Sequence, residues 1–347
     1  MNIIVVMAVK KYTYFIGIDI SRNQLDMAVM ESRNLLFHRQ IDNHPTAIKE
    51  FITELKNLPK FAYTKTVFCM EHTGVYGNHL LTALQRVKTN IVIEASTHIK
   101  NSLGNIRGKS DKIDSIRIAE YAYRSREHLR LWVQKRPVIQ QLHELNTLRE
   151  RMMGLKIAIK TPLKEDASFL KKRSVTLSYG LCAKSIVALE GDLLSIEKLI
   201  DELIAKDERL KHLMQLITSV AAIGRVTAIM MIICTNEFRN ISDPKKFACY
   251  AGVAPFVRES GMFKGRAKVS PMANKKMKSL LHMCALSART RLPDLKAFYL
   301  RKTIDEGKSK MSVINAVRYK LILRVFACVN QDRFYEKGYV RPVCAEQ

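Results

Sequence analysis

The stretch Tyr14-Phe-Ile-Gly-Ile-Asp-Ile-Ser-Arg22 constrains the fold of this chain most, because it is a short apolar run that carries one carboxylate, Asp19, near its end. A short apolar run predicts a buried β-strand. A charge that is buried in a strand without a partner costs free energy. Asp19 therefore needs a partner, and the candidates are a cation, a buried basic side chain, or a metal ion shared with other carboxylates.

The chain carries a large excess of positive charge. It has 58 lysines and arginines against 32 aspartates and glutamates, which gives a formal net charge of +26 over 347 residues. Such an excess predicts a polyanionic partner, and nucleic acid fits best. A solvated basic surface with no nucleic-acid role is the alternative. No stretch is long and apolar enough to span a bilayer, so we expect no membrane partner.

The cysteines indicate a reducing compartment. There are seven, scattered along the chain, and they lack the Cys/His spacing of a zinc site. We therefore expect free thiols, a cytoplasmic location and no zinc.

Residues 1–130 are predicted to form an α/β domain. Apolar runs separated by turn-forming residues predict an antiparallel meander of three strands, and later apolar runs predict two more strands with helices between and after them. The predicted strands are residues 13–20, 25–30, 35–41, 66–70 and 91–94, and the predicted helices are residues 46–58, 76–87 and 112–123.

Three further carboxylates are placed to join Asp19. Glu71 follows the strand 66–70, and Asp111 and Asp114 are three residues apart, which puts both on one face of a helix. If the strands that carry Asp19 and Glu71 are neighbours, their ends meet at one edge of the sheet. Four carboxylates at one place are stable only around divalent cations, and hard oxygen ligands select Mg²⁺ or Mn²⁺. Two such ions can polarise a phosphodiester.

Each of these carboxylates also has a purely structural interpretation. An aspartate at the end of a strand often forms a turn. Asp111, beside Ser110, is a candidate helix cap, and Glu71 could cap the segment that follows it. The order of the four, with Gly17 close to the first and Gly74 close to the second, favours the metal site.

Three blocks of sequence surround the four carboxylates. They are Ile16-Gly-Ile-Asp-Ile-Ser21, Met70-Glu-His-Thr-Gly-Val-Tyr-Gly77 and Lys109-Ser-Asp-Lys-Ile-Asp-Ser-Ile-Arg-Ile-Ala119. These blocks resemble the DEDD domain of the IS110 family of insertion-sequence transposases. The resemblance implies a RuvC-like, ribonuclease-H-like sheet with the four carboxylates as catalytic metal ligands. It also implies a bacterial or archaeal protein associated with the nucleoid.

Residues 131–216 are predicted to form a helical coiled-coil region. Apolar residues recur at steps of three and four from Leu142 to Ile159 and again from Ile186 to Ile217. We expect Pro162 to end the first helix. The stripes could pair within one chain, as a spacer, or between chains. Because recombinases act on two duplexes at once, the second arrangement predicts a homodimer or homotetramer.

Residues 217–330 are predicted to form a mainly α-helical domain, followed by a tail, residues 331–347. The domain starts with a segment, Ile217 to Ala228, that resembles a helix-hairpin-helix turn, in which backbone N–H groups receive a phosphate. Ala222 stands where such turns usually have glycine. From Pro255 to Arg289 there are eight lysines or arginines and one acid, a density that binds phosphates.

The residues expected to contact nucleic acid are Lys109, Arg258, Lys264, Arg266, Lys268, Lys275 and Lys276.

Ser260-Gly261 lies in the basic segment and resembles the serine-glycine motif of the same transposase family. The resemblance implies that Ser260 is the nucleophile of a serine transposase domain. A serine that attacks DNA conserves the energy of the broken bond in a phosphoserine link. Ser270 is the competing candidate, but Pro271-Met-Ala273 follows it where a basic residue and a glycine are expected.

The resemblance covers residues 12 to about 330 and implies a transposase or recombinase that excises and inserts its own element in double-stranded DNA, guided by a bridge RNA. Two alternatives remain. One is a RuvC-like junction resolvase or nuclease that hydrolyses DNA with two metal ions and no covalent intermediate. The other is a nucleic-acid-binding protein whose acidic cluster is degenerate.

Overall fold

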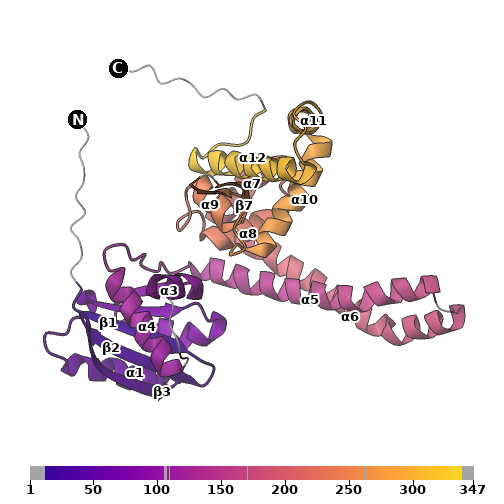
Figure 1. Cartoon of the computed structure of the whole chain (residues 1–347). Helices are drawn as coiled ribbons and strands as arrows, with labels where there is room; N and C mark the ends of the chain where they lie inside the picture. Colours follow the sequence, from indigo (N-terminus) through magenta and orange to yellow (C-terminus); the bar gives the residue numbers. More distant parts are fainter. Residues whose placement is uncertain (1–11, 105–107, 109, 170, 262, 338–347) are drawn as a thin grey trace. The chain divides into compact units, whose positions relative to one another are not determined.

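The computed structural model describes residues 12–104, 108, 110–169, 171–261 and 263–337 (Figure 1). The chain divides into two compact units, residues 1–134 and 135–347. The first unit is a mixed α/β domain built around a sheet, and the second is mainly helical. Among the described residues, no helix has the length and apolar character needed to cross a membrane.

The first unit contains a five-stranded sheet with the strand order β3-β2-β1-β4-β5. Strands β1, β2 and β3 form an antiparallel meander, and β4 and β5 run parallel to β1. The predicted meander and the two later strands are therefore confirmed. The strands are β1 (Tyr14–Ile20), β2 (Gln24–Glu31), β3 (Asn34–Asp42), β4 (Thr66–Glu71) and β5 (Asn90–Glu94).

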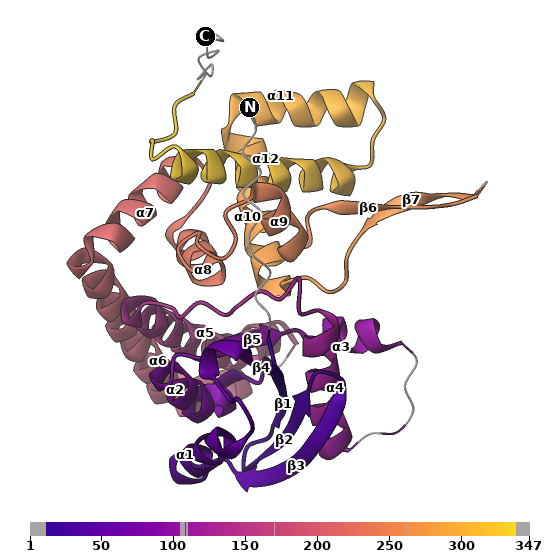
Figure 2. The ribbon, with the colours of Figure 1, turned by 90° about the vertical axis from the view of Figure 1, so that its left-hand side faces the viewer.

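Helices cover both faces of this sheet (Figure 2). Because side chains alternate along a strand, Ile16 and Ile18 of β1 face one side, where they share a core with the helices α1 (Pro45–Glu54) and α2 (Asn78–Arg86). Phe15 faces the other side and packs against the helix α4. Helix α4 (Asp111–Arg124) confirms the prediction, whereas the short helix α3 (Ser96–Leu103) was not predicted.

Helix α4 approaches β1 so closely that only glycine fits at position 17. A Cβ atom on Gly17 would lie 2.1 Å from the carbonyl oxygen of Ser115 and 2.2 Å from the backbone nitrogen of Ala119. Ser115 and Ala119 are both small and fully buried. The backbones of helix and strand are thus in direct contact two residues before Asp19.

The second unit begins with a helical hairpin, α5 (Pro137–Phe169) and α6 (Lys172–Lys206). Its two helices pack against each other, and ion pairs such as Lys160–Glu190 and Arg149–Glu197 link them. The predicted helices are confirmed, but Pro162 does not end the first one. Proline removes one backbone hydrogen bond, and the packing of α5 on α6 carries the helix through that position.

The rest of the second unit is a helical bundle with one β-hairpin. Its helices are α7 (Glu208–Ser219), α8 (Arg225–Thr235), α9 (Pro244–Tyr250), α10 (Lys275–Arg291), α11 (Pro293–Leu300) and α12 (Lys310–Asn330). The hairpin, β6 (Pro255–Ser260) and β7 (Phe263–Val269), was not predicted. In the turn between α7 and α8, Ala222 has a φ of 75°, the conformation that glycine adopts most easily.

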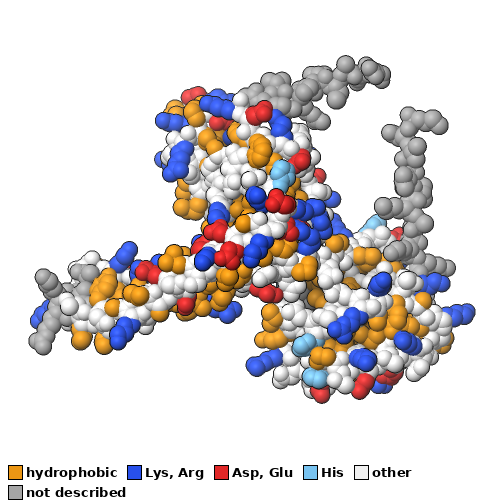
Figure 3. Space-filling model, turned by 180° about the vertical axis from the view of Figure 1, so that it is seen from behind, with side chains coloured by type: hydrophobic (Ala, Val, Ile, Leu, Met, Phe, Trp, Pro, Cys, Tyr) orange, Lys and Arg blue, Asp and Glu red, His pale blue; other side chains and the backbone are white. Residues whose placement is uncertain are grey.

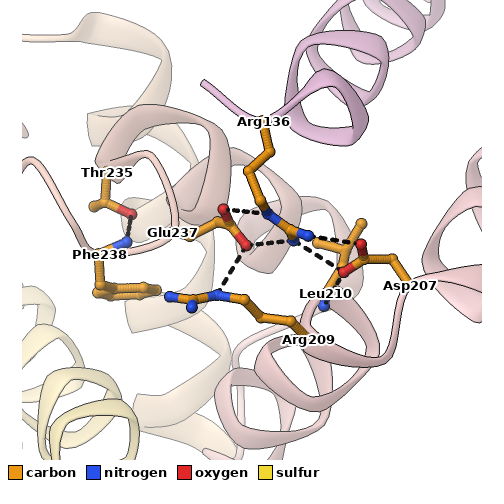
Figure 4. A network of polar contacts seen from close by, with 7 residues as sticks. All are labelled: Arg136, Asp207, Arg209, Leu210, Thr235, Glu237 and Phe238. Carbon is orange, nitrogen blue, oxygen red and sulfur yellow. Dashed lines mark hydrogen bonds and ion pairs between the residues drawn. The ribbon is translucent and has the colours of Figure 1, made fainter. Parts of the chain in front are cut away.

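A partly buried ion-pair network links three helices of the second unit (Figure 4). Arg136, just before α5, binds Asp207 (2.7 Å) and Glu237 (2.6 Å), and Arg209 also reaches Glu237 (3.1 Å). The Glu237 side chain is fully buried and follows α8 in a left-handed turn. Two arginines neutralise its charge, so the network joins the starts of α5 and α7 to the end of α8.

We predict that Gly17→Ala destabilises the first unit by about 1–3 kcal/mol, because the new methyl group must push α4 away from β1. The single tryptophan, Trp132, packs against the core of this unit, so its fluorescence during urea unfolding measures the effect. Gly77→Ala in the same unit is the matched control, because the φ of Gly77 is negative and a Cβ there meets only side-chain atoms, at 3.6 and 3.8 Å. An unchanged unfolding midpoint for Gly17→Ala would contradict the close-contact interpretation.

Candidate active site

The first unit brings the four predicted carboxylates to one edge of its sheet. Asp19 lies near the end of β1, and Glu71 is the last residue of the neighbouring parallel strand β4. Asp111 and Asp114 lie in the first turn of α4, the helix that contacts β1. Ser110 caps this helix by accepting a hydrogen bond from the Ile113 N–H (3.3 Å), so Asp111 is not needed as the cap.

The electrostatics of Asp19 reflect this arrangement. Burial, the largest cause, together with the charges of Asp111, Asp114 and Glu71 raises the pKa of its carboxyl to about 6, against the opposing effect of the Ile20 N–H. The carboxyl is therefore placed where negative charge is unfavourable. A cation bound nearby would reverse that preference.

Two of the four carboxylates are engaged by neighbouring side chains. Glu71 accepts a hydrogen bond from the Ser96 hydroxyl at the start of α3, and Asp114 pairs with Arg117 (2.9 Å). Within the described part of the chain, no three Asp, Glu, His or Cys side chains converge closely enough to form a metal cage. Two of the four carboxylates thus lie against other side chains rather than against one another.

The chemistry of this donor set fits a hard divalent cation. All four candidate ligands supply oxygen, and Mg²⁺ and Mn²⁺ prefer carboxylate oxygens. Ser96 and Arg117 contact two of these groups, Glu71 and Asp114 respectively. Small side-chain rotations would therefore release them.

Sequence reasoning missed two residues at this edge of the sheet, Ser96 and Glu94. Glu94 ends β5 and lies beside Glu71 in the parallel register. Its carboxylate accepts hydrogen bonds from the Tyr121 hydroxyl of α4 (2.9 Å) and from its neighbour's backbone, the Ala95 N–H (3.0 Å). The signal was present in the sequence, because the third parallel strand also ends in a carboxylate.

The second unit contains both candidate serines. Ser260 is exposed and is the last residue of β6, and Gly261 follows with a φ of 56°. Ser270 lies just after β7, is half-buried, and its hydroxyl accepts a hydrogen bond from the Met272 N–H (3.2 Å). Ser270 thus stabilises a turn, whereas Ser260 is presented at the tip of a hairpin.

Of the basic residues predicted to contact nucleic acid, the described ones are exposed in the second unit: Lys268, Lys275 and Lys276. Lys276 pairs with Glu150 of α5. Lys109 lies outside the described residues, as do the side chains of Arg258, Lys264 and Arg266, whose backbones belong to the hairpin. On the face that Figure 3 shows, lysine and arginine side chains are scattered over both units.

Comparisons with known proteins match both units. A transposase model of the DEDD type matches residues 16–165, and a model described as the transposase IS116/IS110/IS902 family matches residues 214–300. The pilin gene-inverting protein of Moraxella bovis is 25% identical over 327 residues, which cover 93% of this chain and 98% of that relative. The pilin gene-inverting protein of Moraxella lacunata is 24% identical with the same coverage.

We predict that Asp19→Asn stabilises the metal-free protein above pH 6 but not at pH 4. The raised pKa means that ionising Asp19 destabilises the folded state, so the contribution of Asp19 to the free energy of unfolding falls as the pH rises from about 4 through about 6. The expected gain at pH 7.5 is on the order of 1 kcal/mol, allowing for solvent screening of a partly exposed group.

The measurement is Trp132-monitored unfolding in EDTA at both pH values. Asp42→Asn at the exposed end of β3 is the matched control and should show no such pH dependence. An equal effect of Asp19→Asn at pH 4 and pH 7.5 would contradict the electrostatic account.

Proposed function

Because the chain belongs to the IS110 family of transposases, we propose that it cuts and rejoins double-stranded DNA through a serine nucleophile, Ser260, assisted by a divalent metal site. The protein is a DNA transposase or recombinase. The proposed metal ligands are Asp19, Glu71, Asp111 and Asp114.

The observation that carries the proposal is the position of Asp19, a partly buried carboxylate whose pKa is raised by burial and by three other carboxylates. A site of this kind disfavours bare negative charge, and it is therefore suited to cations. When bound, Mg²⁺ or Mn²⁺ would polarise the scissile phosphodiester and stabilise the attacking and leaving oxygens. The ribonuclease-H-like, RuvC-like assignment is supported by the strand order and by the helix α4 that carries two of the ligands.

Ser260 supplies the proposed covalent step. Its hydroxyl loses a proton as its oxygen attacks a DNA phosphorus, one phosphorus–oxygen bond of the strand breaks, and a DNA hydroxyl leaves. The phosphoserine that forms keeps the bond energy, so a second DNA hydroxyl can attack it and restore the serine. The exposure of Ser260 supports it over Ser270, whose hydroxyl already accepts a backbone hydrogen bond.

The charge of the chain supports further partners. A net charge of +26 suits binding to the backbones of DNA and of a bridge RNA that guides the reaction. Apolar side chains on the α5–α6 hairpin, including Leu155, Leu181 and Leu194, are exposed. Exposed apolar side chains on a long helical hairpin support pairing between protomers, and hence a homodimer or homotetramer.

We predict that Ser260→Ala abolishes recombination but leaves DNA binding intact, because the substitution removes only the attacking oxygen. Ser270→Ala, the matched control, should retain recombination. The decisive measurement is to trap a covalent protein–DNA adduct and to map the modified residue by mass spectrometry. Full activity of Ser260→Ala would remove the serine mechanism and leave the alternative of a RuvC-like nuclease without a covalent intermediate.

We also predict that Asp19→Ala and Asp114→Ala each abolish strand cleavage, and that EDTA does the same to the wild type. Cleavage of a labelled duplex, measured across a Mg²⁺ and Mn²⁺ titration, tests this. Asp42→Ala provides the control for a carboxylate outside the site. Cleavage that persists in EDTA would contradict the metal site.

A further inference from the structure

Arg318, on the helix α12, is a buried cation to which no carboxylate of the described residues binds. Only 6% of the residue is exposed. Its Nη1 donates to the Asn315 side-chain oxygen (3.3 Å) and its Nη2 to His282 Nδ1 (2.5 Å), while its Nε has no hydrogen-bond partner. Within the described residues, no aspartate or glutamate forms an ion pair with it. All its contacts are therefore with neutral groups.

This arrangement is energetically unfavourable as it stands. Burial lowers the pKa of Arg318, which shows that its charge is destabilised, and a buried charge normally needs a partner of opposite sign. Other arginines of the same unit have such partners: Arg136 and Arg225 bind carboxylates, and Arg324, six residues along the same helix, binds Asp294. Arg318 is thus poised for an anion that comes from outside the chain.

The guanidinium lies one side chain below the surface. The Met311 sulfur lies 3.9 Å from Nη2, and the Met311 residue is 60% exposed. His282 is half-buried on α10, and Lys278 precedes it by one helical turn on the same face. Methionine is unbranched and flexible, so its side chain can move aside at little cost. An anion could then reach Arg318 next to two further nitrogen-bearing side chains.

The site adjoins the segment that leads into the β-hairpin. Asn315 donates a hydrogen bond to the Val253 carbonyl (2.7 Å), two residues before β6 begins, and the Lys278 side chain passes beside Gly252. Arg318 is therefore linked through its neighbour Asn315 to the base of the hairpin whose tip carries Ser260. A ligand held here would be held close to that base.

We propose that Arg318, His282 and Lys278 form a phosphodiester-binding site that holds a nucleic-acid backbone beside the base of the β6–β7 hairpin. A guanidinium matches the geometry of phosphate oxygens. The inference rests on the proposed nucleic-acid chemistry of this unit but not on the identity of the nucleophile. The proposed site uses side chains of α10 and α12 that are not among the residues predicted from the sequence to contact nucleic acid.

The test is Arg318→Met, compared with Arg324→Met on the same helix. A phosphate contact predicts that Arg318→Met lowers affinity for a short DNA duplex about ten-fold and lowers the slope of log K against log salt by about 1. It also predicts that the variant melts at the same or a higher temperature, because an unpaired buried charge has been removed. Arg324→Met should lose thermal stability and keep its DNA affinity.

Affinity is measured for three ligands, duplex DNA, single-stranded RNA and inorganic phosphate, so that the source of the bound phosphate can be identified. We expect duplex DNA, single-stranded RNA or both to lose affinity, whereas an effect confined to inorganic phosphate would overturn the nucleic-acid assignment. A lower melting temperature of Arg318→Met with unchanged affinity for all three would assign the arginine a structural role and overturn the proposal.

If Arg318→Met does not fold, His282→Ala, which removes a half-buried side chain, must show the same affinity loss. Ser260→Ala should bind all three ligands normally. The experiment therefore distinguishes an error in the assignment of the nucleophile from an error in the assignment of the phosphate site.

Discussion

The first unit depends on one close contact between backbones, that of α4 with β1 at Gly17. A glycine in the middle of the strand removes the Cβ that would otherwise hold the helix away, and Ser115 and Ala119 leave room on the helix side. This contact places the first turn of α4, with Asp111 and Asp114, next to the end of β1. The repulsion felt by Asp19 is thus a direct consequence of how tightly helix and strand pack.

The second unit contains two buried charged side chains, Glu237 and Arg318, whose surroundings differ. Glu237 is fully buried, but Arg136 and Arg209 neutralise it, so the network contributes to a fixed geometry at the base of the bundle. Arg318 is nearly as buried and has only neutral contacts. Both side chains lie in one unit, so a buried charge with ion-pair partners and a buried charge with none among the described residues can be compared directly.

Local patterns predicted most of the secondary structure. Short apolar runs between turn-forming residues identified the five strands of the first sheet, and apolar repeats identified α5 and α6. The errors have local physical causes. Pro162 was expected to end a helix, but packing against α6 outweighs one lost hydrogen bond. The β6–β7 hairpin was missed because its strands are rich in charged residues and lack a clear apolar face.

The sequence by itself determined the chemistry available to this protein: which carboxylates follow strands, which serine precedes a glycine, and where positive charge is dense. Only the tertiary structure decided which of these groups act on one another. The strand order placed Glu71 and Glu94 side by side, and packing exposed Ser260 while it committed Ser270 to a turn. It also buried Arg318 with no counter-charge from the part of the chain that the structure describes, since α10 and α12 meet through long-range packing that no local pattern encodes.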